Sequence, residues 1–188
     1  MSNILDQLHR DHINQSRLLN LLEREMLKME KGEDPSYLNM YDIMSYMINY
    51  PDVFHHPHEE VLFKKLKEVD AGAAMTINRL CDEHKKLNAL GTELESMLHV
   101  AISGNIVSKD KLSKEVREYL EIIRDHMNIE ERQIFPLIRE EMTQDDWERM
   151  LPSLEQVQDP LFGNVIADEF LRLYDSIMDK GKDQAIYK

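Results

Sequence analysis

Cysteine is almost absent from this chain, because only one of its 188 residues, Cys81, is a cysteine. An internal disulfide needs two cysteines, so a fold stabilised by oxidative cross-links is excluded. The residues around Cys81 form an apolar part of an expected helix, and we interpret Cys81 as a small buried hydrophobic side chain. A thiol ligand or a redox sensor is the alternative.

Glycine, proline and long apolar runs are also scarce. Six Gly and six Pro, set against 12 Met and abundant Leu, Ile, Glu and Lys, favour helix over strand. No apolar run approaches the ~18–20 residues that a membrane-spanning helix needs. The polar N-terminal segment has no apolar signal-peptide centre, and we therefore expect a cytoplasmic protein that does not enter a membrane.

Positive charge is in the minority, since 23 Lys and Arg face 36 Asp and Glu, for a net charge of −13. Such an acidic surface repels phosphate backbones and anionic lipids. Nucleic acid and membrane surfaces are therefore not expected partners.

Apolar residues are arranged at steps of three and four along four long segments, as on the buried face of a helix. Glycine, proline and capping residues bound these segments, which we place at 2–31, about 35–69, 73–102 and 109–141. Pro51 and Pro57 predict a kink in the second segment. A short helix is expected after a capping signal at Thr143, and a last helix at 161–180.

This pattern predicts an all-α fold, an antiparallel up-down four-helix bundle with an extra C-terminal helix. We assign residues 1–142 to the bundle and residues 143–188 to a C-terminal helical extension packed on it. The chain contains no visible output domain, and a monomer or a homodimer is expected.

Histidine and glutamate occupy core-facing positions in all four segments, in two copies of one arrangement. A single histidine is followed 42 or 43 residues later by a His-x-x-x-Glu, and the copies are offset by 71 to 72 residues. Residues i and i+4 of a helix point the same way, so each His-x-x-x-Glu can reach one site. The residues concerned are His12, His55 and Glu59 in the first copy and His84, His126 and Glu130 in the second.

A metal site is the interpretation that this repeat favours. A single histidine on an apolar face is usually a hydrogen-bonded core residue, but a buried glutamate needs a cation, and no Lys or Arg lies on the four apolar stripes. Imidazole and carboxylate together suit iron, manganese or zinc. Four imidazoles and two carboxylates are too few for two six-coordinate ions, so bridging groups or extra ligands must complete the shells. The Glu-x-x-His of ferritin-like bundles and the zincin motif are both absent.

The segments LHRDHINQSRLLNLLE, YPDVFHHPHEE, DEHKKL and HMNIEERQIFPLI resemble the hemerythrin-like, or HHE cation-binding, domain over about residues 4–140. DPLFG and the segment after it resemble the tail of bacterial single-domain members. The resemblance implies a non-haem di-iron centre with an oxo or hydroxo bridge, for which zinc or manganese could substitute. It also implies that His12, His55, His84 and His126 are terminal ligands and that Glu59 and Glu130 bridge the two ions.

The chain departs from the oxygen-carrying hemerythrins in two places. Those proteins have a His-x-x-x-His on the third helix, whereas Asn88 follows His84 here. They also have Asp five residues after the last ligand histidine, where this chain has Glu131. Oxygen transport is therefore not favoured, and a more open or more labile iron site is expected.

Four spare residues are candidates to complete the site, with a surface position as the alternative for each histidine: His9, His56, His58 and, as a carboxylate, Glu60. His99 is expected in solvent, and Tyr46 and Tyr50 in the helical core.

No catalytic acid or base stands out beyond the expected ligands, which favours binding over turnover. We predict a di-iron protein that binds or senses a small ligand such as O2, NO or peroxide. The resemblance leaves two alternatives, an iron donor for the repair of iron–sulfur clusters and a di-iron enzyme that processes peroxide or NO. A structural bundle, in which the metal only holds the helices together, is the third alternative.

Overall fold

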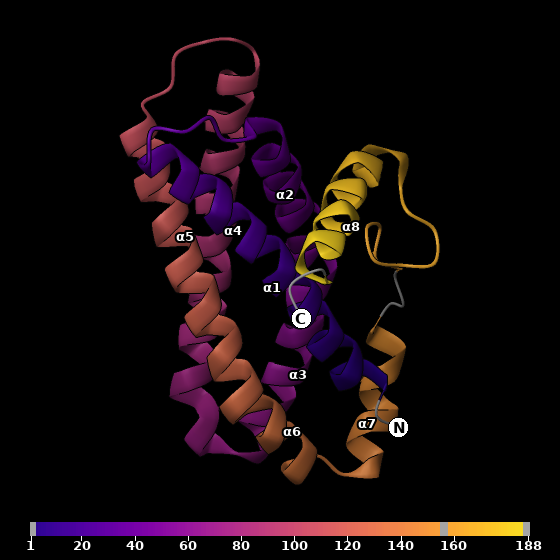
Figure 1. Ribbon diagram of the computed structural model, residues 1–188. Coiled ribbons are helices and arrows are strands. Elements are labelled where there is room, and N and C mark those ends of the chain that lie inside the picture. Colours follow the sequence, from indigo (N-terminus) through magenta and orange to yellow (C-terminus); the bar gives the residue numbers. More distant parts are fainter. Residues whose placement is uncertain (1–2, 155–157, 186–188) are drawn as a thin grey trace.

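The computed structural model describes residues 3–154 and 158–185, and within these residues it contains helices and turns but no strand. Four rods form the bundle (Figure 1). The first is α1 (Asn3–Glu30), and the second joins α2 (Tyr37–Asn49) to α3 (His56–Val69) through the π-helical turn η1 (Pro51–His55). The third is α4 (Ala74–Ile102), and the fourth joins α5 (Lys109–Ile129) to α6 (Phe135–Glu141) through the π-helical turn η3 (Glu130–Ile134). Ser2, at which the first predicted segment begins, lies outside the described residues.

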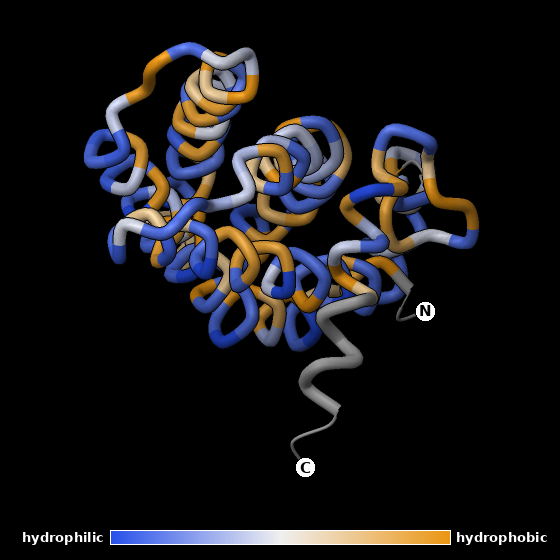
Figure 2. The backbone as a smooth tube through the Cα atoms, turned by 45° about the horizontal axis from the view of Figure 1, so that its top comes forward, coloured by the Kyte–Doolittle hydropathy of each residue, from blue (hydrophilic) through white to orange (hydrophobic). Residues whose placement is uncertain are grey.

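Successive rods run in opposite directions, and each contacts two others, since α1 and α4 both pack on α2 and α5 (Figure 1). Hydrophobic and hydrophilic stretches are interspersed along the coils of the bundle (Figure 2). The predicted all-α bundle is therefore confirmed. No helix among the described residues is long and apolar enough to cross a membrane.

The internal repeat includes the turns that end the rods. Gly32 ends α1 with a φ of 77° and Gly104 ends α4 with a φ of 81°, in the left-handed region that favours glycine. Ser36 then caps α2 by accepting from the N–H of Asn39, and Ser108 caps α5 by accepting from the N–H of Lys111. We therefore call α1 to α3 the first half of the bundle and α4 to α6 the second half.

A proline follows each π-helical turn. Pro57 and Pro136 have no N–H for the carbonyl four residues earlier, and their rings push against it. Those carbonyls belong to Val53 and Arg132, inside η1 and η3. The chain adopts wider hydrogen bonds there, from His56 N–H to Pro51 O and from Phe135 N–H to Glu130 O. The second segment is thus interrupted at 51–55, within the range where a kink was predicted.

The fourth segment was predicted as one regular helix over 109–141, and this is wrong at η3. The turn shifts the helical register by one residue. Phe135 and Ile138 are therefore buried, whereas Leu137, which the regular spacing places in the core, is only half-buried.

The apolar core has two parts with a polar layer between them. The upper cluster joins the C-terminal half of α1 to α2, α4 and α5 and includes Met40, Met44 and Met47. The lower cluster joins the start of α1 to α3, α4, α6 and α7. Along α1, Leu8 belongs to the lower cluster and Leu18 to the upper one, so residues 11 to 15 lie at the level of the polar layer.

Two further helices follow the bundle. In α7 (Gln144–Met150), Thr143 and Asp146 cap each other as predicted, and Lys65 of α3 pairs with Asp146 at 2.9 Å. The last helix, α8 (Leu171–Ala185), begins ten residues later than predicted. Asp159 Oδ1 accepts from the N–H groups of Leu161 and Phe162 and holds a turn where helix was expected.

The segment around α8 contacts the bundle through α2. Arg172 donates to Asp42 at 2.9 Å, and the Tyr46 hydroxyl donates to Asp159 at 2.9 Å. Tyr46 is thus a core residue, as expected, and Tyr50 beside it is also buried. The division of the chain at 142/143 stays a prediction, and residues 155–157 and 186–188 of the predicted extension lie outside the described residues.

Candidate metal centre

The six residues of the repeated pattern meet inside the bundle, between the two apolar clusters. All six side chains are buried, and Glu59 and Glu130 have no exposed surface. They come from four rods: His12 from α1, His55 and Glu59 from η1 and α3, His84 from α4, and His126 and Glu130 from α5 and η3.

Each carboxylate faces histidines from both halves of the bundle. Glu59 lies 3.1 Å from His55 Nε2, 3.5 Å from His12 Nε2 and 3.5 Å from His84 Nε2. Glu130 lies 3.0 Å from His126 Nε2, 3.5 Å from His12 Nε2 and 3.8 Å from His84 Nε2. Two carboxylates placed between imidazoles in this way could be shared by two cations.

The same atoms lack hydrogen bonds. The four oxygens of Glu59 and Glu130, and Nε2 of both His84 and His126, are buried without a hydrogen-bond partner among the described residues. The ion-pair distances above are therefore close contacts without hydrogen-bond geometry. Burying such groups unsatisfied is very costly, and no Lys or Arg of the described residues pairs with either carboxylate. This donor set fits metal cations.

A ring of outer carboxylates surrounds the imidazoles. In five histidines, Nδ1 lies close to a carboxylate oxygen of a residue outside the cluster. The pairs are His12 with Glu131 at 2.8 Å, His55 with Asp11 at 3.1 Å, His56 with Asp52 at 2.8 Å, His84 with Glu60 at 3.3 Å and His126 with Glu83 at 3.1 Å. Such partners fix the ring orientation and the tautomer, so that Nε2 is the nitrogen left for a metal.

Among these five histidines, only His56 is not part of the repeated pattern, and the sequence made it a spare candidate. It is 6% exposed, so the surface position considered as its alternative is wrong. Its ring stacks on that of His84, with centroids 4.2 Å apart. The π-helical turn at 51–55 shifts the register of the later residues by one relative to α2, which turns position 56 toward the face that regular spacing gives to position 55.

Two groups of candidate ligand atoms each lie within 4.8 Å of one another. One contains His56, Glu59, His84 and His126, and the other contains His12, His55 and Glu59. Neither includes Glu130, although its oxygens face His126 and His12 at the distances above. Glu59 belongs to both groups, which suits two neighbouring cations.

The remaining candidates lie outside both groups. His9 is exposed and its Nδ1 lies 3.0 Å from Glu131. Glu60 is exposed and approaches His84 from outside. His58 is half-buried, and His99 is exposed as expected. Cys81 is only half-buried at the edge of the lower cluster, which corrects the buried position expected for it, and burial raises the pKa of its thiol.

Without a metal, the cluster balances its charges with protons. Burial lowers the pKa of His12, but contact with Glu131 and Glu59 outweighs it and raises that pKa to about 10. The pKa of His126 is raised in the same way, to about 9, against the effect of burial.

Two other shifts in the cluster run downward. Burial favours the neutral form of Glu130, but His126 and His84 lower its pKa to about 2. Burial lowers the pKa of His56 to about 4, so this imidazole is neutral near pH 7. A cation that binds the cluster must therefore displace protons from the other histidines.

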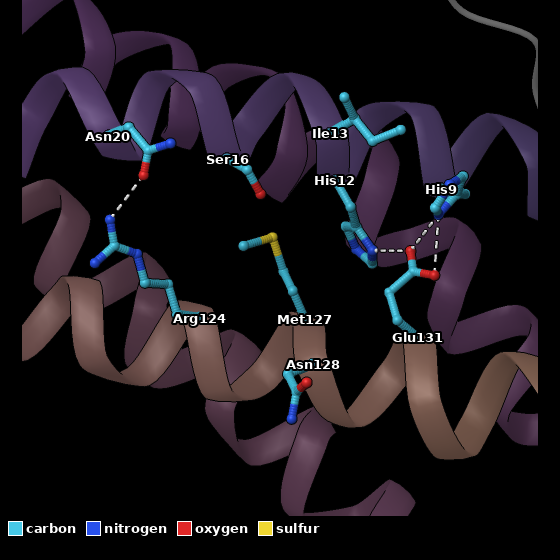
Figure 3. A pocket seen from close by; sticks show the side chains of 9 residues that line it. All are labelled: His9, His12, Ile13, Ser16, Asn20, Arg124, Met127, Asn128 and Glu131. Carbon is cyan, nitrogen blue, oxygen red and sulfur yellow. Dashed lines mark hydrogen bonds and ion pairs between the residues drawn. The ribbon is translucent and has the colours of Figure 1, made fainter.

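A pocket of about 580 Å³ opens between α1 and α5 and reaches the edge of His12 (Figure 3). Glu131 spans His12 and His9 at one end, and Arg124 donates to Asn20 at the other. Between them, Met127 points from α5 toward Ser16 of α1 (Figure 3). The pocket joins the surface of the bundle to one side of the cluster.

Comparison with known families identifies one match. The family described as hemerythrin, HHE cation binding domain, matches residues 3–138, which is most of the chain. No curated protein and no solved structure matches the chain significantly.

Proposed function

Because this chain belongs to the hemerythrin family of HHE cation-binding domains, we propose that its buried cluster holds two iron ions and binds a small ligand such as O2 or NO. The observation that carries the proposal is the set of buried, unbonded atoms on Glu59, Glu130, His84 and His126. Metal cations would satisfy all of these atoms together, since the described residues offer the two carboxylates no positive side chain other than histidine.

The ligands would be the six residues of the repeated pattern. His12 and His55 would hold one ion, His84 and His126 the other, and Glu59 and Glu130 would be shared between them. The mixture of imidazole and carboxylate, without thiolate, is the set that non-haem iron and manganese use.

The outer carboxylates favour highly charged ions. Each carboxylate at Nδ1 makes its imidazole a more basic ligand. The five outer carboxylates and the two inner ones surround the site with negative charge, which trivalent ions balance better than divalent ones. We therefore favour iron, which is stable as Fe³⁺, over zinc, which is not.

Bound iron would supply a redox-active centre with affinity for O2 and NO. The protein supplies the rest. The two apolar clusters keep bulk water from the centre, the outer carboxylates hold the imidazole rings, and the pocket beside His12 offers a small molecule a short approach. The cytoplasmic location and the monomeric or homodimeric state remain parts of this proposal.

The test is metal analysis of untagged protein purified without chelators, with absorption spectra before and after reduction and after exposure to O2 or NO. We expect two iron ions per chain and charge-transfer bands that each gas changes. Glu130→Gln should lose the bands, whereas Asp82→Asn, which alters an exposed carboxylate outside the cluster, should keep them.

Three other results would contradict gas binding. Iron-loaded protein with a spectrum that ignores both gases would do so directly. Ready loss of iron to a weak chelator on reduction would favour the iron donor for cluster repair. Zinc in the purified protein, with unfolding on its removal and no response to gas, would favour the structural bundle.

A further inference from the structure

The two-fold repeat extends from the inner residues to the outer carboxylates. Asp11 precedes His12 as Glu83 precedes His84, and they contact the equivalent histidines His55 and His126. The residue that follows each inner glutamate is also a carboxylate, and it contacts the first histidine of the pattern in the opposite half of the bundle. These are Glu60, which contacts His84, and Glu131, which contacts His12.

The repeat fails at one outer contact. Asp52 lies 2.8 Å from His56 through Oδ1, and its Oδ2 accepts from the side-chain amide of Asn88 at 2.8 Å. The contacts His56–Asp52–Asn88 therefore join α3 to α4 through η1. With the same offsets, the equivalent positions in the second half are Ile123, Met127 and Ser16. Isoleucine and methionine side chains cannot form these polar contacts. The pocket beside His12 lies between Met127 and Ser16 (Figure 3).

The environment of His56 is that of the other four imidazoles. It is buried, it stacks on His84, and its Nδ1 is occupied by a carboxylate. One of its nitrogens lies within 4.8 Å of candidate ligand atoms of Glu59, His84 and His126. With Nδ1 held by Asp52, Nε2 is the nitrogen that can bind a cation.

We propose that His56 is a fifth imidazole ligand and that Asp52 and Asn88 are the residues that position it. This rests on the proposed metal centre and makes its two halves unequal. His56, His84 and His126 would serve one ion, and His12 and His55 would serve the other. The less crowded ion is the one on the side of the pocket.

The test compares His56→Gln with His58→Gln, a histidine two residues further along the same helix that belongs to neither group of candidate ligands. Both variants and the wild type are loaded with Fe²⁺ in air. Iron per chain, the rate of iron loss to a chelator, and the Mössbauer spectrum are then measured. We expect His56→Gln to lose one ion, or to release it at least about tenfold faster, with one of two iron signals altered. His58→Gln should match the wild type.

Two positioning variants keep the proposal testable should His56→Gln fold poorly. Asp52→Asn keeps the shape of a side chain that is 9% exposed, and Asn88→Ala alters an exposed side chain. Both should speed the loss of the same ion, Asp52→Asn by about tenfold and Asn88→Ala by less. A purely structural role would change the melting temperature of the metal-free protein and leave the Mössbauer signals alone.

The outcomes separate this inference from the proposed function. Two ions in the wild type, with unchanged stoichiometry, release and Mössbauer signals in His56→Gln and Asp52→Asn, would overturn only the role of His56. A wild-type protein that binds no iron would overturn both.

Discussion

The two halves of the bundle use the same pattern of residues but place it differently on the backbone. In the first half, His55 ends the π-helical turn and Glu59 lies in the regular helix after it. In the second half, His126 lies in the regular helix and Glu130 begins the turn. Both arrangements bring histidine and glutamate to about 3 Å of each other. The site therefore constrains the side chains more tightly than the backbone that carries them.

The halves differ most beside the cluster. The first half has a buried histidine at position 56, whereas the second has Met127 at the equivalent position, beside an open pocket. The six residues of the repeated pattern are thus arranged almost symmetrically, whereas the residues beside them are not.

The largest effect is expected from the inner carboxylates, where the halves should be equivalent. Glu59→Gln and Glu130→Gln each remove a charge shared between the two proposed ions. Each should cost more than the 10–100-fold that loss of an outer partner costs in metal affinity, and should affect both ions. Metal titration of the two variants measures this. A variant that loses only one ion would show that its carboxylate is not shared.

Smaller and again equal effects are expected from the outer carboxylates Asp11 and Glu83. Asp11→Asn and Glu83→Gln keep the shape of the side chain but weaken its hold on His55 and His126. We expect each to lower iron affinity by about 10–100-fold. Competition with a chelator checks this, with Asp82→Asn, beside Glu83 and exposed, as the control. Unequal losses would mean that the outer shell does not share the symmetry of the inner one.

The pH dependence should have opposite signs with and without metal. The pKa values of His12 and His126 are raised to about 10 and about 9 in the metal-free protein. The protonated forms of these two histidines therefore stabilise the folded protein fully below the unfolded-state pKa of about 6.5. This stabilisation is lost as pH rises through their folded-state pKa values. Metal binding needs neutral imidazoles and should strengthen over the same range.

Denaturant unfolding of both forms between about pH 6 and pH 10 measures this dependence. The metal-free protein should become less stable with rising pH, and the gain in stability on adding metal should grow. Calorimetry in buffers of different ionisation enthalpy should also detect proton release when metal binds near pH 7. Parallel slopes for the two forms would contradict the protonated cluster.

The smallest predicted effect concerns the two capping serines, which are equivalent in the repeat. Ser36→Ala and Ser108→Ala each remove the side-chain acceptor at the start of a helix. Each should cost about 1 kcal/mol of unfolding free energy and leave iron content unchanged. Chemical denaturation checks the equality, and a cost confined to one variant would show that only one cap contributes.

Much of the site was predictable from the sequence because its signal is local. Histidines within apolar stripes, and a glutamate four residues after two of them, define a face of a helix without any knowledge of the fold. His56 was harder to assign, because a regular helix turns it away from His55. The turn at 130–134 depends on Pro136, whose ring pushes against the carbonyl of Arg132, and the apolar spacing of the segment does not show it.

Helical periodicity depends only on near neighbours, so the four amphipathic rods and their six inner side chains follow from the order of the residues alone. Which carboxylate holds which imidazole, and that His56 joins the cluster, follow from the packing of the rods. Those contacts join residues as far apart as His12 and Glu131, 119 positions along the chain. Such pairings depend on how the rods are set against one another, and no local pattern records that.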